Sequence, residues 1–557
     1  MSTGSSRLRS FSSRLRNARV RHMVFLPLTL PFTLARFFGQ QLTIPEAKTR
    51  LRGELANRET RFFELARRRF YAQPEGPYGK LLKHAGCELA DLDSSLRRDG
   101  LEDTLVQLAR QGVYLTTAEF KGKEDVVRGG LSFRVRPEDL EPRRGLVGGD
   151  VTPAFVTQSS GSSNRPVRSL SSLDWQMEET AAVAVFLEAH GLLAHRHAAY
   201  EPMIPGVGGI IILMMMARIG VPCERWFARP VPINNWLEGA YFRITAQELS
   251  LAGTRFGPGF AKPELVPAED MVRLVRWVEE NQREGKQTCI RTVASNAARV
   301  ARVANQVGVS LEGCTFIASG EPLTAAKRLV IEEAGANVTV LWGYEPGPVH
   351  VGFGCGRPAH GDEMHVLRHT LAVIEHPEPI VEAAGEPVRP LLFTTLYSSA
   401  ARMQLNVSNG DRAILSERPC GCALHEVGLT LHAHQVGSFE KLTSEGLAYS
   451  FEDLFELLET HLPDEFGGGT GDYQILEEES ADGKTYVTLL VDPAVGAIDE
   501  QRLLERFAGA IASKSPQHRF AAELWQTSGT FRVRREVPVA SARGKILPLR
   551  MARHRRR

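Results

Sequence analysis

The chain has 557 residues, of which 43% are apolar and 24% charged, an ordinary composition for a globular protein. This length is too great for one hydrophobic core and indicates roughly two to four folding units. A net charge of +2 excludes bulk attraction to nucleic acid, and seven cysteines, most of them isolated, favour a reducing cytoplasm over a disulfide framework.

The N-terminus is basic and then apolar. The first 22 residues carry six arginines and no acid, and Met23–Phe38 follows as an apolar stretch. Pro27 and Pro31 interrupt this stretch, which is shorter than the ~20 residues of a spanning helix. We interpret 1–44 as an extension whose apolar part forms a strand or turn packed on the main domain. A peripheral membrane-surface anchor is the alternative, and export is the least favoured.

The first half of the chain contains several predicted helices. Residues 45–71 are helical by spacing, with Pro45 near the start, and 171–195 predicts an amphipathic helix. The glycines of 206–209 predict a turn, followed by a buried helix over Ile210–Ala217. Its methionine cluster is typical of core filling.

The central region alternates between helix and strand. Helices are expected over 268–283, Asn296–Val307 and 325–334, and short buried strands over Thr315–Ala318 and Asn337–Trp342. This alternation is typical of an α/β fold whose large, multi-layer N-terminal domain is built on mostly parallel sheets. We place that domain at 45–437.

The pattern changes after about residue 438. A helix at 452–461, strands at 472–478 and 485–491, a helix at 499–513 and a last strand region at 518–538 are expected. These elements predict a small α+β C-terminal domain of ~120 residues, 438–557, large enough to fold by itself.

A hydroxyl-rich segment lies at 159–168, reading Ser-Ser-Gly-Ser-Ser-Asn-Arg-Pro-Val-Arg. Small residues free backbone N–H groups that can surround a polyphosphate together with hydroxyls and a cation. Its candidate phosphate ligands are Ser159, Ser160, Gly161, Ser162, Ser163, Arg165 and Arg168. Alone, such a segment is more often an ordinary loop.

Four later motifs follow this segment in a particular order. They are Ser319-Gly320-Glu321-Pro322-Leu323, Trp342-Gly343-Tyr344-Glu345-Pro346, Asn409-Gly410-Asp411 and Ala542-Arg543-Gly544-Lys545. Together the five resemble the acyl-adenylate-forming superfamily, and Cys420-Gly421-Cys422 after the aspartate motif resembles its phenylacetate–CoA ligase branch. The resemblance covers about residues 75–550.

The resemblance implies a role for each motif. The hydroxyl-rich segment would hold the β- and γ-phosphates of ATP, and Glu345 would ligate Mg²⁺. Asp411 would accept hydrogen bonds from the ribose, and Lys545 would neutralise charge between the carboxylate and the α-phosphate. Adenine would lie along Gly320, Glu321 and Pro322. The residues Trp342, Gly343 and Tyr344 would lie beside it, and the ring of Trp342 or of Tyr344 would stack on it. The C-terminal domain would be mobile, turning at a hinge whose acid is Glu440.

Each residue also has a plainer interpretation. Glu345 could be a strand-end acid, Asp411 a turn-former and Lys545 a solvated lysine of a basic tail. The chain also departs from the family pattern. Asn164 and Val167 replace the usual glycine and lysine of the phosphate loop, no hydroxyl residue precedes Glu345, and the hinge lacks its usual arginine.

The Cys-Gly-Cys turn can present two thiolates to one metal. The branch that the chain resembles sometimes carries a structural zinc, which implies a quartet of Cys355, His365, Cys420 and Cys422, with His360 as a substitute ligand. The alternative is two unrelated loops with reduced thiols.

The combined interpretation is an acid–thiol ligase that uses ATP and Mg²⁺. It would activate a small carboxylic acid as acyl-AMP and transfer the acyl group to coenzyme A. The acid pocket would lie between 204–217 and the residues around 291–296 and 319–345. Two alternatives are an adenylating enzyme with an amine or carrier-protein acceptor and a non-catalytic descendant that binds a nucleotide or a protein. A cytoplasmic location, with peripheral membrane contact through the N-terminus, and a homodimer are further expectations.

Overall fold

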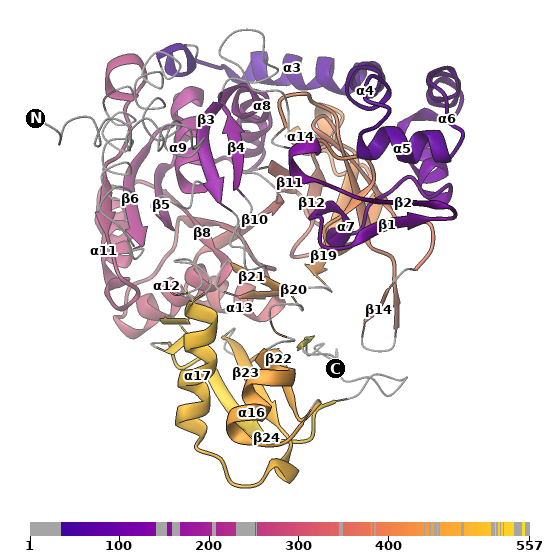
Figure 1. The fold of residues 1–557 in the computed structure, drawn as a ribbon. Coiled ribbons are helices and arrows are strands. Elements are labelled where there is room, and N and C mark those ends of the chain that lie inside the picture. Colours follow the sequence, from indigo (N-terminus) through magenta and orange to yellow (C-terminus); the bar gives the residue numbers. More distant parts are fainter. Residues whose placement is uncertain are drawn as a thin grey trace, which may run out of the picture.

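The computed structural model describes most of the chain. The described residues are 35–39, 41–140, 153–158, 168–202, 208–229, 251, 253–344, 349–379, 381–383, 386–400, 402–438, 441–444, 447–450, 454, 457–469, 471–480, 484–513, 519, 522–523, 525–526, 528–539 and 549–551. The fold is α/β, as predicted, with a large sheet at its centre and a small four-stranded sheet near the C-terminus (Figure 1).

The central sheet has ten strands in the order β18-β19-β12-β11-β10-β9-β8-β5-β6-β7. The strands from β10 to β7 are parallel to their neighbours, and those from β10 to β18 pair antiparallel. Their bounds are β5 (Arg196–Pro202), β6 (Cys223–Arg229), β7 (Pro263–Leu265), β8 (Thr288–Val293), β9 (Cys314–Ser319), β10 (Asn337–Tyr344), β11 (Val349–Gly354), β12 (Met364–Val366), β18 (Asp411–Glu417) and β19 (Leu431–Ser438). Every residue of β8 is buried, as expected for a parallel strand covered on both faces.

Helices cover both faces of the parallel strands (Figure 1). On one face lie α8 (Leu173–Ala189) and α9 (Gly208–Ile219), and on the other α11 (Val272–Arg283), α12 (Ala294–Gln306) and α13 (Ala325–Glu333). All five helices were predicted. However, α8 is buried without interruption over 179–187, so it is a central core helix and not the amphipathic helix that was expected.

The N-terminal helices and a further set of strands lie outside the central sheet. These helices are α3 (Ile44–Ala56), α4 (Arg58–Ala66), α5 (Pro77–His84), α6 (Leu89–Arg110) and α7 (Thr117–Phe120), and a π-helical turn, Arg67–Tyr71, extends α4. The strands are β1 (Asp125–Arg128), β2 (Leu131–Arg134), β13 (Leu371–Glu375), β14 (Val381–Ala383), β15 (Glu386–Val388), β16 (Leu391–Thr395) and β17 (Val407–Ser408). The helix predicted over 45–71 is confirmed, with a break at Asn57.

The end of the N-terminal apolar stretch lies in the core. Residues 35–38 are helical, so the strand or turn that we expected there is wrong. Phe37 and Phe38 are fully buried, and Phe38 packs edge-on against Phe260, with 6.2 Å between ring centroids. Residues 1–34 lie outside the described part of the chain. Within the described part, no helix has both the length and the apolar character needed to cross a bilayer.

The C-terminal segment has a core of its own, built from leucines, Phe507, Trp525 and Phe531. Its sheet runs β24-β23-β22-β25, packed beside α17 (yellow in Figure 1). A hairpin of β20 (Lys441–Ser444) and β21 (Leu447–Ser450) precedes this unit. The bounds of the unit's elements are α16 (Leu462–Phe466), β22 (Tyr473–Glu479), β23 (Thr485–Val491), α17 (Glu500–Ala512), β24 (Phe531–Arg535) and β25 (Leu549–Met551). The strand expected over 518–538 is shorter, because 522–523 and 525–526 are helical.

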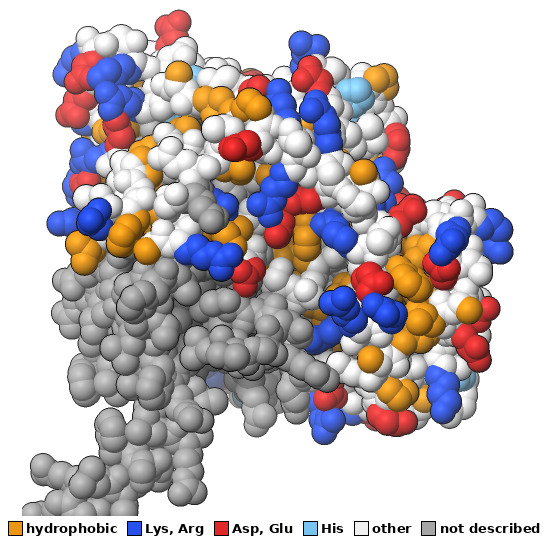
Figure 2. All heavy atoms as spheres, turned by 90° about the horizontal axis from the view of Figure 1, so that it is seen from above, with side chains coloured by type: hydrophobic (Ala, Val, Ile, Leu, Met, Phe, Trp, Pro, Cys, Tyr) orange, Lys and Arg blue, Asp and Glu red, His pale blue; other side chains and the backbone are white. Residues whose placement is uncertain are grey.

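Charges of both signs are mixed on the described part of the upper face (Figure 2). Several are paired across or along helices, such as Lys48 Nζ with Glu188 at 2.8 Å and Arg50 Nε with Glu54 at 2.8 Å. Such partly exposed pairs contribute little to stability individually.

Candidate functional site

Two of the predicted motifs lie at the same edge of the central sheet. Strands β8, β9 and β10 are adjacent and parallel, so their carboxyl ends are side by side. The Ser319–Leu323 motif begins at the end of β9, and Trp342–Tyr344 forms the end of β10. In open α/β sheets, ligands bind outside the carboxyl ends of the strands.

Glu321 is held within the protein at this edge. Its Oε1 accepts a hydrogen bond of 2.7 Å from the backbone N–H of Ser295, in the first turn of α12, and its Oε2 lies 3.2 Å from Lys327 Nζ. Both side chains are almost fully buried. Burial acts to lower the pKa of Lys327, but the carboxylates of Glu321 and Glu479 outweigh it and raise that pKa. Glu321 therefore joins the β9 loop to α12 and α13.

The tryptophan of the aromatic motif, at the end of β10, is mostly buried. Trp342 is 7% exposed and packs edge-on against Phe393, with 6.0 Å between ring centroids, so its ring belongs mainly to the core. The register of β10 with β11 shifts between Trp342 and Gly343. Such an irregularity interrupts the regular pairing of β10 and β11 at this sheet edge.

Asp411 begins β18 and is 7% exposed. The preceding turn is built by Asn409, whose side-chain oxygen accepts from the Asp411 N–H at 3.0 Å and whose amide donates to Asp411 Oδ2 at 2.8 Å. Gly410 has φ +82°, a conformation that favours glycine. Asp411 is thus both a turn residue and a carboxylate held in a fixed orientation.

The hinge sequence is Gly437-Ser438-Phe439-Glu440-Lys441, and its first two residues lie beside this aspartate. Ser438 is the ladder partner of Asp411, and its Oγ donates to the carbonyl of Gly410 at 3.0 Å. Gly437 pairs with Arg412. The acid expected at the hinge, Glu440, lies outside the described residues.

The hydroxyl-rich segment joins two paired strands. β3 (Pro153–Gln158) and β4 (Arg168–Ser172) form an antiparallel hairpin in which Gln158 faces Arg168, and α8 follows directly. Glu345 and Lys545 lie outside the described residues. So do the other predicted phosphate ligands, which are Ser159, Ser160, Gly161, Ser162, Ser163 and Arg165.

A hydrogen bond joins the C-terminal sheet to the candidate site. The Thr324 hydroxyl, which caps α13, donates to the carboxylate of Glu479 at the end of β22. Glu479 also acts electrostatically on Lys327. The loop after β9 is therefore joined to the C-terminal unit.

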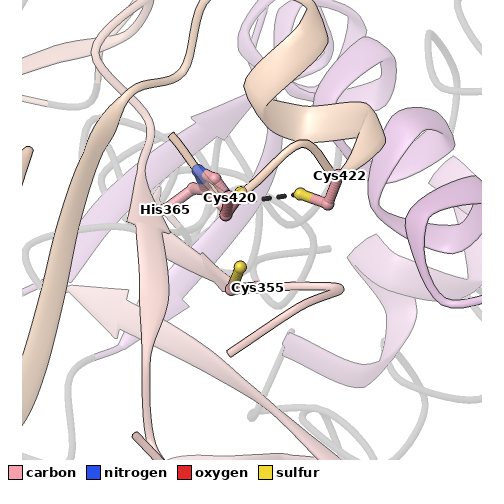
Figure 3. A group of neighbouring side chains, drawn as sticks. All are labelled: Cys355, His365, Cys420 and Cys422. Atoms are coloured by element: carbon pink, nitrogen blue, oxygen red, sulfur yellow. Dashed lines mark hydrogen bonds between the residues drawn. The ribbon is translucent and has the colours of Figure 1, made fainter. Parts of the chain in front are cut away.

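Three cysteines and a histidine converge from three places in the sequence (Figure 3). Cys355 follows β11, His365 lies on β12, and Cys420 and Cys422 follow β18. One ligand atom from each lies within 4.8 Å of all the others, and His365 Nε2 is 3.1 Å from Cys422 Sγ and 3.5 Å from Cys420 Sγ. A tetrahedral zinc with Zn–S of ~2.3 Å separates its ligands by ~3–4 Å, so this donor set fits zinc.

The surroundings orient these ligands. His365 Nδ1 lies 2.6 Å from the carbonyl of Leu429, which favours a tautomer with Nε2 free for a metal. Contacts with Cys355 and His365 lower the pKa of Cys422, and thiolate is the form that binds metal. His360, expected as a substitute, instead stacks on His434 with 4.0 Å between ring centroids.

Glycines allow the close packing of this cluster. A side chain at Gly354 would meet Thr339 Oγ1 at 2.1 Å, and one at Gly356 would meet the carbonyl of Ala189 at 2.5 Å. Cys355, between them, can therefore lie tightly against α8. Gly421, between the other two cysteines, has φ +69°.

No protein-family profile matches the chain, and no curated protein matches it. Among solved structures it is similar to a 2-hydroxyisobutyryl-CoA ligase in complex with 2-HIB-AMP and CoA in the thioesterification state. The sequence identity is 16% and the TM-score 0.51, over 93% of this chain and 92% of that chain. The same ligase in the postadenylation state gives a TM-score of 0.43 at 16% identity over 93% and 92% of the two chains. An o-succinylbenzoate CoA synthetase from Bacillus subtilis gives 0.39 at 10% identity, over 72% of this chain and 69% of that chain.

The chain has the fold of an acyl-CoA ligase. The α/β architecture with a C-terminal unit, expected from the sequence, is thereby confirmed.

The residues that support the motifs were not predicted from the sequence. Lys327 and Glu479 carried no motif, and only the fold brings them to Glu321 and Thr324. Arg418, beside the cysteine cluster, was also missed. It pairs with Glu363 at 2.6 Å, and its Nη2 lies 3.7 Å from Cys355 Sγ.

Proposed function

We propose that this protein is an adenylate-forming ligase that activates a carboxylic acid with ATP and transfers the acyl group to the thiol of coenzyme A. The observation that carries the proposal is the meeting of the Ser319–Leu323 and Trp342–Tyr344 motifs at one sheet edge, in a fold shared with an acyl-CoA ligase. We further propose membership of the phenylacetate–CoA ligase-like branch, which the cysteine cluster supports.

In the first step, a carboxylate oxygen attacks the α-phosphorus of ATP, and the bond to pyrophosphate breaks. Asp411, held by the Asn409 turn, accepts hydrogen bonds from the ribose. The backbone N–H groups and hydroxyls of 159–163, with Arg165 and Arg168, hold the β- and γ-phosphates. Glu345 would hold Mg²⁺, which would supply positive charge beside the phosphates. Lys545 stabilises the charge that collects between the two reactants.

In the second step, the thiol sulfur attacks the acyl carbon and AMP leaves. The C-terminal domain, 438–557, turns about the hinge to change which of its faces meets the large domain, 45–437. The Thr324–Glu479 contact belongs to one of these two arrangements. The cysteine cluster would hold zinc in a structural role, and the metal would join the loop after β11 to the loop after β18.

ATP–pyrophosphate exchange with a panel of carboxylic acids tests the first step, and detection of the acyl-CoA product tests the second. Lys545→Ala should abolish exchange but keep transfer to CoA from a supplied acyl-adenylate. Lys484→Ala, in the same C-terminal unit, is the matched control and should leave exchange unchanged. Exchange without a CoA product would indicate an amine or carrier-protein acceptor. Absence of acyl-AMP with every acid, although nucleotide binds, would favour the non-catalytic alternative.

A further inference from the structure

Arg291 is a charged residue in an unusual place. It lies on β8, a central parallel strand in which every residue is buried, two residues before its carboxyl end. Alternation along the strand puts Arg291 on the same face as Cys289, whose cluster includes the methionines of α9. Arg291 therefore lies on the α8–α9 face, close to the sheet edge that carries the candidate site.

This guanidinium is incompletely satisfied. Glu201, near the end of the neighbouring β5, is its nearest carboxylate, with 3.7 Å between Oε1 and Arg291 Nε, which is longer than a hydrogen bond. Among the described residues, Nε and Nη1 have no hydrogen-bond partner, and the Arg291 side chain is only 8% exposed. A buried donor without an acceptor costs ~1–3 kcal/mol, and more when charged.

The charges around Arg291 are already balanced. Glu201 offsets the guanidinium at ion-pair distance. The other nearby carboxylate, Glu179 on α8, accepts from the His350 backbone N–H at 2.9 Å and lies 3.0 Å from His350 Nδ1. An additional buried anion would lack a counter-charge, and isolated buried charge is expensive. A neutral oxygen would instead use the free N–H donors without adding charge.

We propose that Arg291 is a specificity-determining residue that donates hydrogen bonds to a neutral oxygen, a hydroxyl or carbonyl, on the substrate acid, away from its reacting carboxylate. This proposal rests on the proposed function, because it takes the substrate to be the acid that the enzyme activates. The substrate class is thus an oxygen-substituted carboxylic acid with an otherwise apolar skeleton, suited to the methionine-rich surroundings of α9.

Binding of matched acids to the full chain, measured by titration calorimetry without ATP, tests this assignment. The probes are phenylacetate with para-hydroxyphenylacetate, and hexanoate with ω-hydroxyhexanoate and adipate. We expect a hydroxylated acid to bind at least ~10-fold more tightly than its deoxy partner, because a site built for an oxygen leaves its donors unpaired without one. Adipate should bind no better than hexanoate.

The double variant Arg291→Met with Glu201→Gln should reduce this preference to about one. Arg291→Lys keeps the charge opposite Glu201, should lose most of the preference, and serves if the double variant does not fold. Arg218→Met removes another buried arginine, on α9, and should keep the preference. The proposal would be overturned by equal binding within each pair, by tighter binding of adipate or by no binding of any acid. An unchanged preference in the variants would overturn it as well. If the protein prefers the hydroxylated acids but catalyses no pyrophosphate exchange, the proposed reaction is wrong and the role of Arg291 in binding stands.

Discussion

Asp411 lies directly opposite Ser438 in the antiparallel ladder of β18 and β19. The residue proposed to hold the ribose and the start of the proposed hinge are thus one backbone pair. Ser438 also donates to Gly410, within the turn that orients Asp411. A rotation that begins after Ser438 would start within one hydrogen bond of the nucleotide.

Replacing Asp411 should weaken nucleotide binding. Asp411→Ala removes the acceptor for the ribose hydroxyls, and hydrogen bonds to charged groups contribute ~1.5–3 kcal/mol each. We expect the KM for ATP to rise ~10-fold or more in pyrophosphate exchange. Asn409→Ala disturbs the same turn but keeps the carboxylate, so it should have a smaller effect. Equal effects of the two variants would reduce Asp411 to a turn residue.

The Thr324–Glu479 contact predicts a conformational test. A disulfide between Thr324→Cys and Glu479→Cys would fix the C-terminal unit in the present arrangement. We expect the oxidised double variant to retain only one of the two half-reactions and the reduced form to retain both. Each single cysteine variant controls for the native thiols. Full activity of the oxidised form in both steps would mean that the C-terminal unit does not need to turn.

The buried pair of Glu321 and Lys327 should be important for stability. Lys327→Met leaves a buried carboxylate without its counter-charge, which typically costs ~3–5 kcal/mol. Adding Glu321→Gln should recover part of this loss in urea unfolding. The exposed pair of Lys286 with Glu284, at 2.6 Å, is the comparison, and Lys286→Met should cost less than ~1 kcal/mol. A loss from Lys327→Met that is equally small would contradict the packing described for α13.

The cysteine cluster predicts bound zinc. Purified protein should contain about one zinc per chain, and a chelator should lower the Tm, because metal that binds only the folded state adds to folding stability. Cys422→Ser should reduce the zinc content, whereas Cys87→Ser, far from the cluster in sequence, should not. Zinc content near zero in carefully prepared protein would leave the cluster as reduced thiols.

Buried histidines should make the protein sensitive to acid. Burial lowers the pKa of His197 to about 4, although the carbonyl of Leu192 at 2.8 Å partly opposes this. The folded pKa therefore lies below the ordinary ~6.5 of the unfolded chain. The stability contribution is present above about pH 6.5 and is lost as the pH falls towards about 4, because the unfolded chain binds the proton first. His197→Asn should flatten this dependence in urea unfolding, whereas the exposed His84→Asn should not. The same pH dependence of unfolding free energy in both variants would contradict the role of His197.

The sequence alone determined the α/β class, the five helices that cover the parallel strands and the strands β9 and β10, because continuous apolar runs and helical spacing are local signals. It also predicted that Cys355, His365, Cys420 and Cys422 would share a site, through a resemblance carried by the Cys-Gly-Cys motif. Helical spacing, apolar runs and the Cys-Gly-Cys motif are short-range patterns, which a chain carries whatever it packs against.

Only the tertiary structure decided which residues support those motifs. Lys327 and Glu479 could not be assigned to the candidate site from the sequence, because lysines and glutamates are usually solvated. Only packing buries Lys327 against Glu321 and brings Glu479 to Thr324. The uninterrupted burial of 179–187 in α8, and of Phe37 and Phe38, could not be predicted either, since burial on all sides depends on elements distant in sequence. The unpaired donors of Arg291 could not be predicted from the sequence either, because its surroundings form only when β5, β8 and α8 pack together.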